Sequence, residues 1–190
     1  MNLNQLKTLF EENGSHKIYV KTLSPNDNSK NQVYLGGGFE ILNILPISEI
    51  KTEAAGDWER ERFKASINFS WIMDDGNIYP APQSQLILYP KYPEVRFSGF
   101  LARCENPPSD LLTQRLADRL LFLAAAKNGT VLGYVASPTS TIAKEFDKAT
   151  FTSDLGVFKI IELSQTINNK KKLLSELKRN YQLNDDIIYS

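Results

Sequence analysis

Apolar residues recur at helical spacing near both ends of the chain. Leu3, Leu6 and Phe10 fall on one helical face, and Gly14 is suited to the residue after the last turn. A second apolar stripe covers residues 167–181. The pattern therefore predicts a helix at the start and another in the tail.

Between these helices the apolar positions mostly follow the period of two that is typical of strands. The clearest case is residues 63–71, where Phe, Ala, Ile, Phe and Trp alternate with polar residues. Asp74-Asp75-Gly76-Asn77 and Asn128-Gly129 supply hairpin turns. The other strands are expected at residues 16–23, 33–35, 85–89, 95–101, 120–125, 130–136 and 157–163.

Two shorter helices and one polar stretch complete the pattern. Residues 39–45 and 141–148 are predicted to be helical, the latter with Ser140 as N-cap, and residues 48–62 are predicted to be a solvated excursion. Several strands are linked by hairpins, so the sheet should be antiparallel or mixed. A small barrel or sandwich is therefore favoured over a doubly wound fold.

Composition limits the possible chemistry. With 190 residues and 42% hydrophobic positions, the chain suits one domain with appendages. A single cysteine and a single histidine exclude an internal disulfide and a cysteine-rich zinc site, so we expect no catalytic residue, metal or cofactor. The start of the chain lacks the apolar core of a signal peptide, and no apolar run approaches the ~20 residues of a membrane span. We expect a cytoplasmic protein.

Charge is balanced, with 22 basic and 22 acidic residues. DNA-binding proteins usually carry a basic excess, so any DNA contact here requires a local concentration of positive charge. The lysine run at residues 170–172 is one such concentration, although a solvated helix face explains it better.

Residues 20–36 place many base-reading side chains in one loop. Asn and Gln can pair with adenine, Lys with guanine, and Asp can accept from cytosine. Composition alone favours an ordinary turn, since Ser, Pro, Asn and Asp are common in turns. The candidate DNA contacts are Lys21, Ser24, Asn26, Asp27, Asn28, Ser29, Lys30, Asn31 and Gln32.

Residues 86–101 contain a second candidate segment, stiffened by Pro90 and Pro93. Arginine can grip a guanine edge or a phosphate with two hydrogen bonds, and tyrosine can donate to phosphate. A rigid surface hairpin whose tyrosines pack on the core is an equally good interpretation of this segment alone. The candidate DNA contacts are Tyr89, Lys91, Tyr92, Glu94 and Arg96.

Together with FKASINFSWIMDDG at residues 63–76, these two segments resemble the DNA-binding pseudobarrel of the plant B-three superfamily. Within it, they are most similar to the bacterial branch attached to restriction endonucleases, of the EcoRII N-terminal effector-domain type. The resemblance covers residues 17–163. It implies a mixed α/β fold, an open barrel of about seven mostly antiparallel strands with short helices.

The resemblance also implies how DNA is held. Two arms would clamp the major groove, an N-arm at residues 21–32 and a C-arm at residues 89–96. The EcoRII type has a glycine-rich stretch in its N-arm where this chain has Asn28-Ser29-Lys30-Asn31-Gln32, so the reading of individual bases does not carry over.

The implied role is that of a recognition or effector domain of a type II (IIE-like) restriction endonuclease with the site CCWGG. Its partners would be double-stranded DNA and a nuclease domain in the same polypeptide, and the chain would be a non-catalytic monomer in a bacterial or archaeal cytoplasm. Residues 1–163 would form the DNA-binding domain, and residues 164–190 a helical tail leading towards the nuclease domain.

Two other function classes remain open. A magnesium-dependent nuclease needs an acidic residue followed by Glu-x-Lys, which Glu49-Ile50-Lys51 and Glu176-Leu177-Lys178 spell, with Asp27 or Glu40 upstream. A phospholipase-type nuclease needs paired His-x-Lys motifs, which His16-Lys17 cannot supply. A module that binds protein or small molecules is the third class, although glycines 36–38 lack phosphate-loop spacing.

Overall fold

The computed structural model describes residues 1–24, 27, 32–37, 45–46, 49–53, 62–89, 94–100, 103–105, 107, 118–147, 153–155 and 158–163. These residues form two helices, α1 (Leu3–Glu12) and α3 (Thr141–Phe146). They also form the strands β1 (Lys17–Thr22), β2 (Gln32–Gly37), β3 (Glu49–Glu53), β4 (Arg62–Ser66), β5 (Phe69–Ile72), β6 (Ile78–Pro80), β7 (Gln85–Tyr89), β8 (Glu94–Ser98), β9 (Leu120–Ala125), β10 (Val131–Ala136), β11 (Ser153–Leu155) and β12 (Phe158–Glu162).

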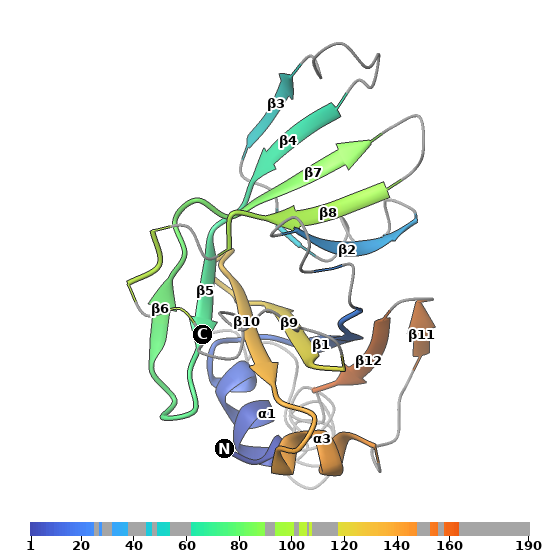
Figure 1. The fold of residues 1–190 in the computed structure, drawn as a ribbon. Coiled ribbons are helices and arrows are strands. Elements are labelled where there is room, and N and C mark those ends of the chain that lie inside the picture. The colour runs from blue at the N-terminus through green and yellow to red at the C-terminus, as the bar shows by residue number, and fades with distance from the viewer. Residues whose placement is uncertain are drawn as a thin grey trace, which may run out of the picture.

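The strands are arranged in two sheets (Figure 1). The seven-stranded sheet has the order β11-β12-β1-β9-β10-β5-β6, and the five-stranded sheet has the order β2-β8-β7-β4-β3. Neighbours are antiparallel except β10 and β5, which are parallel. The fold is therefore mostly β with two sheets and short helices rather than a closed barrel. The predicted number of about seven strands is too low, since the described residues alone form twelve.

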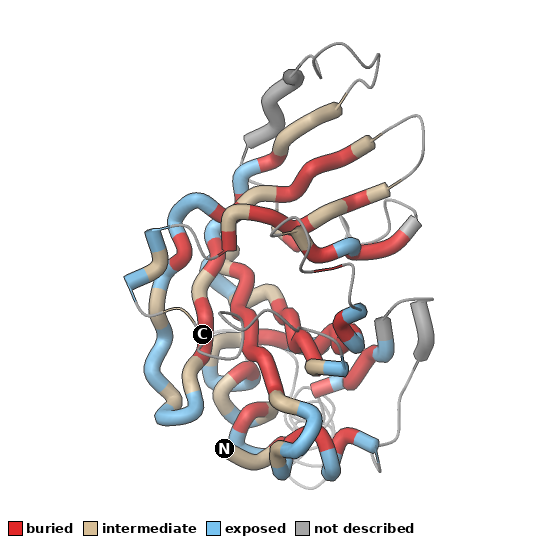
Figure 2. Tube along the Cα trace, in the orientation of Figure 1, coloured by how far each residue is buried: buried red, intermediate tan, exposed pale blue. Residues whose placement is uncertain are grey.

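Two apolar clusters define three layers. One lies between the sheets, where Phe69, Trp71 and Phe97 meet, and the Trp71 indole donates to the carbonyl oxygen of Phe100 at 2.8 Å. The other lies between the seven-stranded sheet and the two helices, and includes Phe10. The buried residues of the five-stranded sheet mostly face the seven-stranded sheet, although Ile87 and Ser98, on the opposite face, are buried as well. Figure 2 shows the buried residues along these strands in red.

The predicted strand at residues 63–71 is two strands in different sheets. Its alternation is confirmed, since Ala65, Ile67, Phe69 and Trp71 are all buried between the sheets. The expectation of a single strand is wrong, because the chain crosses from β4 to β5 at residues 67–68. A period of two records which side of the chain meets the core, but not which neighbour each half pairs with.

Several local predictions are confirmed. Helix α1 forms, although Asn13 is its C-cap and Gly14 follows with φ +79°. Both predicted hairpins form, and Gly76 and Gly129 take positive φ in their turns. Helix α3 has Ser140 as its N-cap.

Other local predictions need correction or stay untested. Residues 49–53 form strand β3, although residues 48–62 were predicted to be a solvated excursion. Strands β6 and β11 were not predicted at all. The predicted tail helix and residues 39–44 lie outside the described residues.

Candidate nucleic-acid interface

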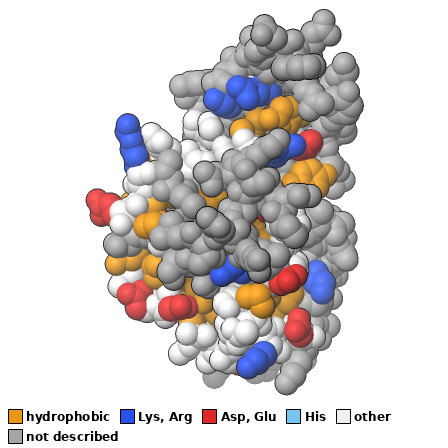
Figure 3. Space-filling view, in the orientation of Figure 1, with side chains coloured by type: hydrophobic (Ala, Val, Ile, Leu, Met, Phe, Trp, Pro, Cys, Tyr) orange, Lys and Arg blue, Asp and Glu red, His pale blue; other side chains and the backbone are white. Residues whose placement is uncertain are grey.

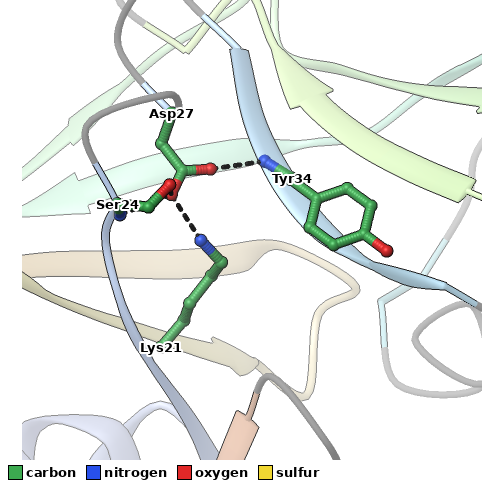
Figure 4. A network of polar contacts seen from close by, with 4 residues as sticks. All are labelled: Lys21, Ser24, Asp27 and Tyr34. Atoms are coloured by element: carbon green, nitrogen blue, oxygen red, sulfur yellow. Dashed lines mark hydrogen bonds and ion pairs between the residues drawn. The ribbon is translucent and has the colours of Figure 1, made fainter.

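The start of the N-arm is tied down by the carboxylate of Asp27 (Figure 4). Its Oδ2 accepts hydrogen bonds from Lys21 Nζ at 2.6 Å, from the Ser24 backbone N–H at 2.7 Å and from Ser24 Oγ at 2.8 Å. Its Oδ1 accepts from the Tyr34 backbone N–H at 2.8 Å. One side chain therefore links the end of β1, the loop after it and strand β2.

The pKa of Asp27 lies below its ordinary value for a reason visible in this network. Burial opposes ionisation of the carboxyl group, but the hydrogen bonds from Lys21, Ser24 and Tyr34 stabilise the charged form and outweigh it. Asp27 is therefore a buried carboxylate that stays charged because its oxygen atoms are saturated with donors.

Two predicted DNA contacts take a different role here. The side chains of Lys21 and Asp27 are 6% and 1% exposed and are paired with each other. In this conformation neither side chain is accessible to a base or a phosphate, because both are buried and form an ion pair with each other. They hold Ser24 and the start of β2 together, and the side chain of Ser24, which is an exposed residue, donates to the same carboxylate.

Acid should weaken this anchor. The folded pKa of Asp27 is lower than the unfolded value of 3.8, so its contribution to stability is complete above 3.8 and is lost as the pH falls through the folded value. We expect the difference in unfolding free energy between wild type and Asp27→Asn to shrink between about pH 7 and about pH 3. Urea unfolding at a series of pH values measures it, and a difference that stays constant would contradict the expectation.

The face of the five-stranded sheet that points away from the seven-stranded sheet is mainly polar. Alternate residues of its strands share this face, and the registers place Tyr34, Arg96, Ile87 and Lys64 in one row. We call this surface the outer face. It comprises Gln32, Tyr34, Arg62, Lys64, Ser66, Gln85, Ile87, Tyr89, Glu94, Arg96 and Ser98.

The outer face carries charged residues of both signs. On β4 and β8 its basic residues are Arg62, Lys64 and Arg96 and its acidic residue is Glu94. The register of β3 with β4 places Glu49, Lys51 and Glu53 on the same side of the sheet. Figure 3 shows Lys and Arg side chains over β4, and a basic and an acidic side chain together over β8. The basic residues Arg62, Lys64 and Arg96 therefore lie on two strands of this face, β4 and β8, in a chain whose overall charge is zero.

Arg96 is held by side chains from three neighbouring strands. Its Nε donates to Glu94 Oε1 on the same strand, and its Nη1 donates to Gln32 Oε1 on β2 at 3.3 Å. Its guanidinium carbon lies 5.4 Å from the centre of the Tyr89 ring on β7, a cation–π distance. The guanidinium group is therefore fixed in orientation on a partly exposed surface.

The two predicted arms lead into the outer face from opposite ends. β2 begins at Gln32, beside Ser98 at the end of β8, whereas β8 begins at Glu94, beside Gly37 at the end of β2. Glu94 and Ser98 are four residues apart, which is about 13 Å along a strand. This distance is close to the width of the DNA major groove, which is about 12 Å.

The structure brings together part of the predicted site. Gln32, Tyr89, Glu94 and Arg96 lie close together on the outer face. Seven other candidates lie outside the described residues: Asn26, Asn28, Ser29, Lys30, Asn31, Lys91 and Tyr92.

Three residues of the outer face were not predicted: Tyr34, Arg62 and Lys64. A signal for the two basic residues was present, since Arg62, Lys64 and Ser66 are the polar partners of Phe63, Ala65 and Ile67 in the strand alternation. Their position beside Arg96 depends on the pairing of β4 with β7 and of β7 with β8.

Comparison with known proteins gives a distant likeness among solved structures. No protein-family model matches the chain, and no curated protein matches it. Among solved structures, it is similar to the B3 domain of the restriction endonuclease UbaLAI, a mutant crystallised with cognate DNA. The TM-score is 0.40 and the identity 19%, over 84% of this chain and 98% of that one.

The features of a metal-dependent nuclease are not brought together in the described residues. Glu49 and Lys51 lie on β3, at the edge of the five-stranded sheet, and Asp27 is engaged by Lys21. Within the ranges that the structure describes, no group of three His, Cys, Asp or Glu residues could hold a metal ion. No helix within those ranges is long and apolar enough to span a bilayer.

Proposed function

We propose that this chain binds double-stranded DNA in a sequence-specific way through the outer face and the two arms beside it. The observation that supports this most is Arg96, fixed by Glu94, Gln32 and Tyr89 between the two points where the arms enter the sheet. A partly exposed arginine with a fixed orientation suits bidentate contact with a guanine edge.

Different parts of the proposed interface would contact the phosphates and the bases. Arg62 and Lys64 on β4 lie farther from the arms and suit contact with the phosphate backbone, which fixes position without reading sequence. The amide-rich N-arm would read bases through Asn26, Asn28, Asn31 and its other predicted contacts. Since the basic groups are few, the non-specific electrostatic attraction should be moderate and most of the affinity should depend on the correct site.

The biological role that we propose follows the sequence resemblance. The chain would be the recognition or effector domain of a type IIE-like restriction endonuclease, with CCWGG as the expected site. Residues 1–163 would form this domain, and residues 164–190 would lead towards a nuclease domain of the same polypeptide. We further propose that it acts as a monomer in a bacterial or archaeal cytoplasm and performs no catalysis itself.

A gel-shift titration tests the central claim. With EDTA present, the protein should bind a CCWGG duplex more tightly than a scrambled duplex of equal length, because base contacts and not a metal determine the affinity. Specific affinities typically exceed non-specific ones by roughly 10³-fold or more.

Two other results of that titration are informative. If both duplexes bind equally, a selection from randomised duplexes decides between a different site and the absence of sequence reading. If no duplex is selected, the proposed function is wrong.

A further inference from the structure

The hydrogen-bonding edges of Arg96 are not all occupied. Glu94 takes the Nε hydrogen and Gln32 takes one hydrogen of Nη1. Within the described part of the chain, this leaves the end of the guanidinium group, formed by Nη2 and the second Nη1 hydrogen, for a ligand. The pair is partly exposed, at 28% for the Arg96 side chain and 23% for that of Glu94.

Glu94 has a second effect on this site, through its charge. It lies two residues before Arg96 on the same strand face and opposite Tyr89 on β7, so the carboxylate and the guanidinium group share one small area of surface. The ion pair is close to neutral overall. A phosphate approaching Arg96 therefore meets a carboxylate as well as a cation.

We propose that Glu94 is a specificity-determining residue, which makes Arg96 a reader of bases and a poor ligand for phosphates. This inference rests on the proposed DNA binding. The carboxylate holds the guanidinium group so that its end faces outward, and its negative charge cancels the attraction that any phosphate would feel. A guanine edge is still bound well, because it needs two directional donors and not a net charge.

Binding to phosphates depends on charge, whereas the reading of bases depends on geometry. Non-specific binding to DNA depends on cations that neutralise phosphates, and each one adds about 0.9 to the slope of log K against log salt. Base reading depends on donors in fixed positions. Removing the charge of Glu94 should therefore strengthen the first kind of binding. Base reading should gain less, because the hydrogen bond that orients Arg96 becomes weaker when its acceptor is no longer charged.

The test is Glu94→Gln, which keeps the shape of the side chain and removes its charge. Affinity is measured by fluorescence anisotropy on the duplex with the highest affinity for the wild type and on a scrambled duplex, over a range of salt concentrations. We expect affinity for the scrambled duplex to rise about fivefold and its salt slope to steepen by about 0.9. Affinity for the specific duplex should change less, so the ratio of the two affinities falls.

Three results would overturn the proposal. An equal rise on both duplexes would mean that Glu94 acts only as a charge, and a fall on the specific duplex alone would mean that it contacts a base. The third is an equal effect from Glu162→Gln, a matched change at an exposed acid on β12, which would mean that only net charge matters. Thermal unfolding of each variant shows that it is folded, and failure of the wild type to prefer any duplex would reject the proposed function itself.

Discussion

Replacing Asp27 by alanine should lower the free energy of unfolding by about 3–5 kcal/mol. The substitution leaves the ammonium group of Lys21 buried and unpaired, at 6% exposure of its side chain. It also removes the acceptor for the backbone N–H groups of Ser24 and Tyr34. Urea unfolding followed by far-UV circular dichroism measures the loss.

A matched control lies on the same strand. Lys17 on β1 pairs with Glu162 on β12, but these side chains are 49% and 38% exposed. Water screens such a pair, so Glu162→Ala should cost less than about 1 kcal/mol. Similar losses for Asp27→Ala and Glu162→Ala would show that the buried network does not anchor the N-arm.

Replacing Arg96 by alanine should weaken specific DNA binding by about 1–3 kcal/mol, which is roughly 5- to 150-fold in the dissociation constant. The expected loss comes from two directional hydrogen bonds to a base edge. The free energy of unfolding of Arg96→Ala should differ little from that of the wild type, because the Arg96 side chain lies on a partly exposed surface. Fluorescence anisotropy on the specific duplex measures the loss.

Two further variants show whether weaker DNA binding by Arg96→Ala comes from the lost hydrogen bonds or from the lost charge. Arg96→Lys keeps the charge but loses the planar fork, so it should bind almost as poorly as Arg96→Ala to the specific duplex. Lys144→Ala removes an exposed charge on α3, which packs on the other side of the seven-stranded sheet, and should leave binding unchanged. Normal binding by Arg96→Ala would remove the C-arm from the proposed interface.

The local sequence predicts the turns and helix caps of this fold well, but it does not predict which strands pair with one another. The turn at residues 74–77, the Asn128-Gly129 turn and the Ser140 cap are all formed by neighbours in sequence, and all are confirmed. The crossing at residues 67–68 depends on where distant strands lie: the Val131 N–H donates to the Asn68 carbonyl oxygen at 2.7 Å. Such pairing is decided by the whole fold.

In the candidate site, too, the local sequence predicts some features and the whole fold decides others. Base-reading residue types select Gln32, Glu94 and Arg96, which the structure places together on the outer face. Composition could not separate them from Lys21 and Asp27, which belong to the same polar segments. Burial separates them, and burial follows from the folded loop. For the same reason Lys64 was missed, because its neighbours on the outer face come from β7 and β8.

The strand order has a consequence for how the chain folds as it is synthesised. All strands of the five-stranded sheet lie within residues 32–98, so this sheet can assemble while the ribosome is still making the second half. Its apolar side, with Val33, Leu86 and Phe97, is then covered only in part, by residues such as Phe69 and Trp71, until β9 and β10 supply Leu121 and Val131. A free fragment that ends near residue 100 would therefore expose part of this apolar side to solvent, and it should aggregate.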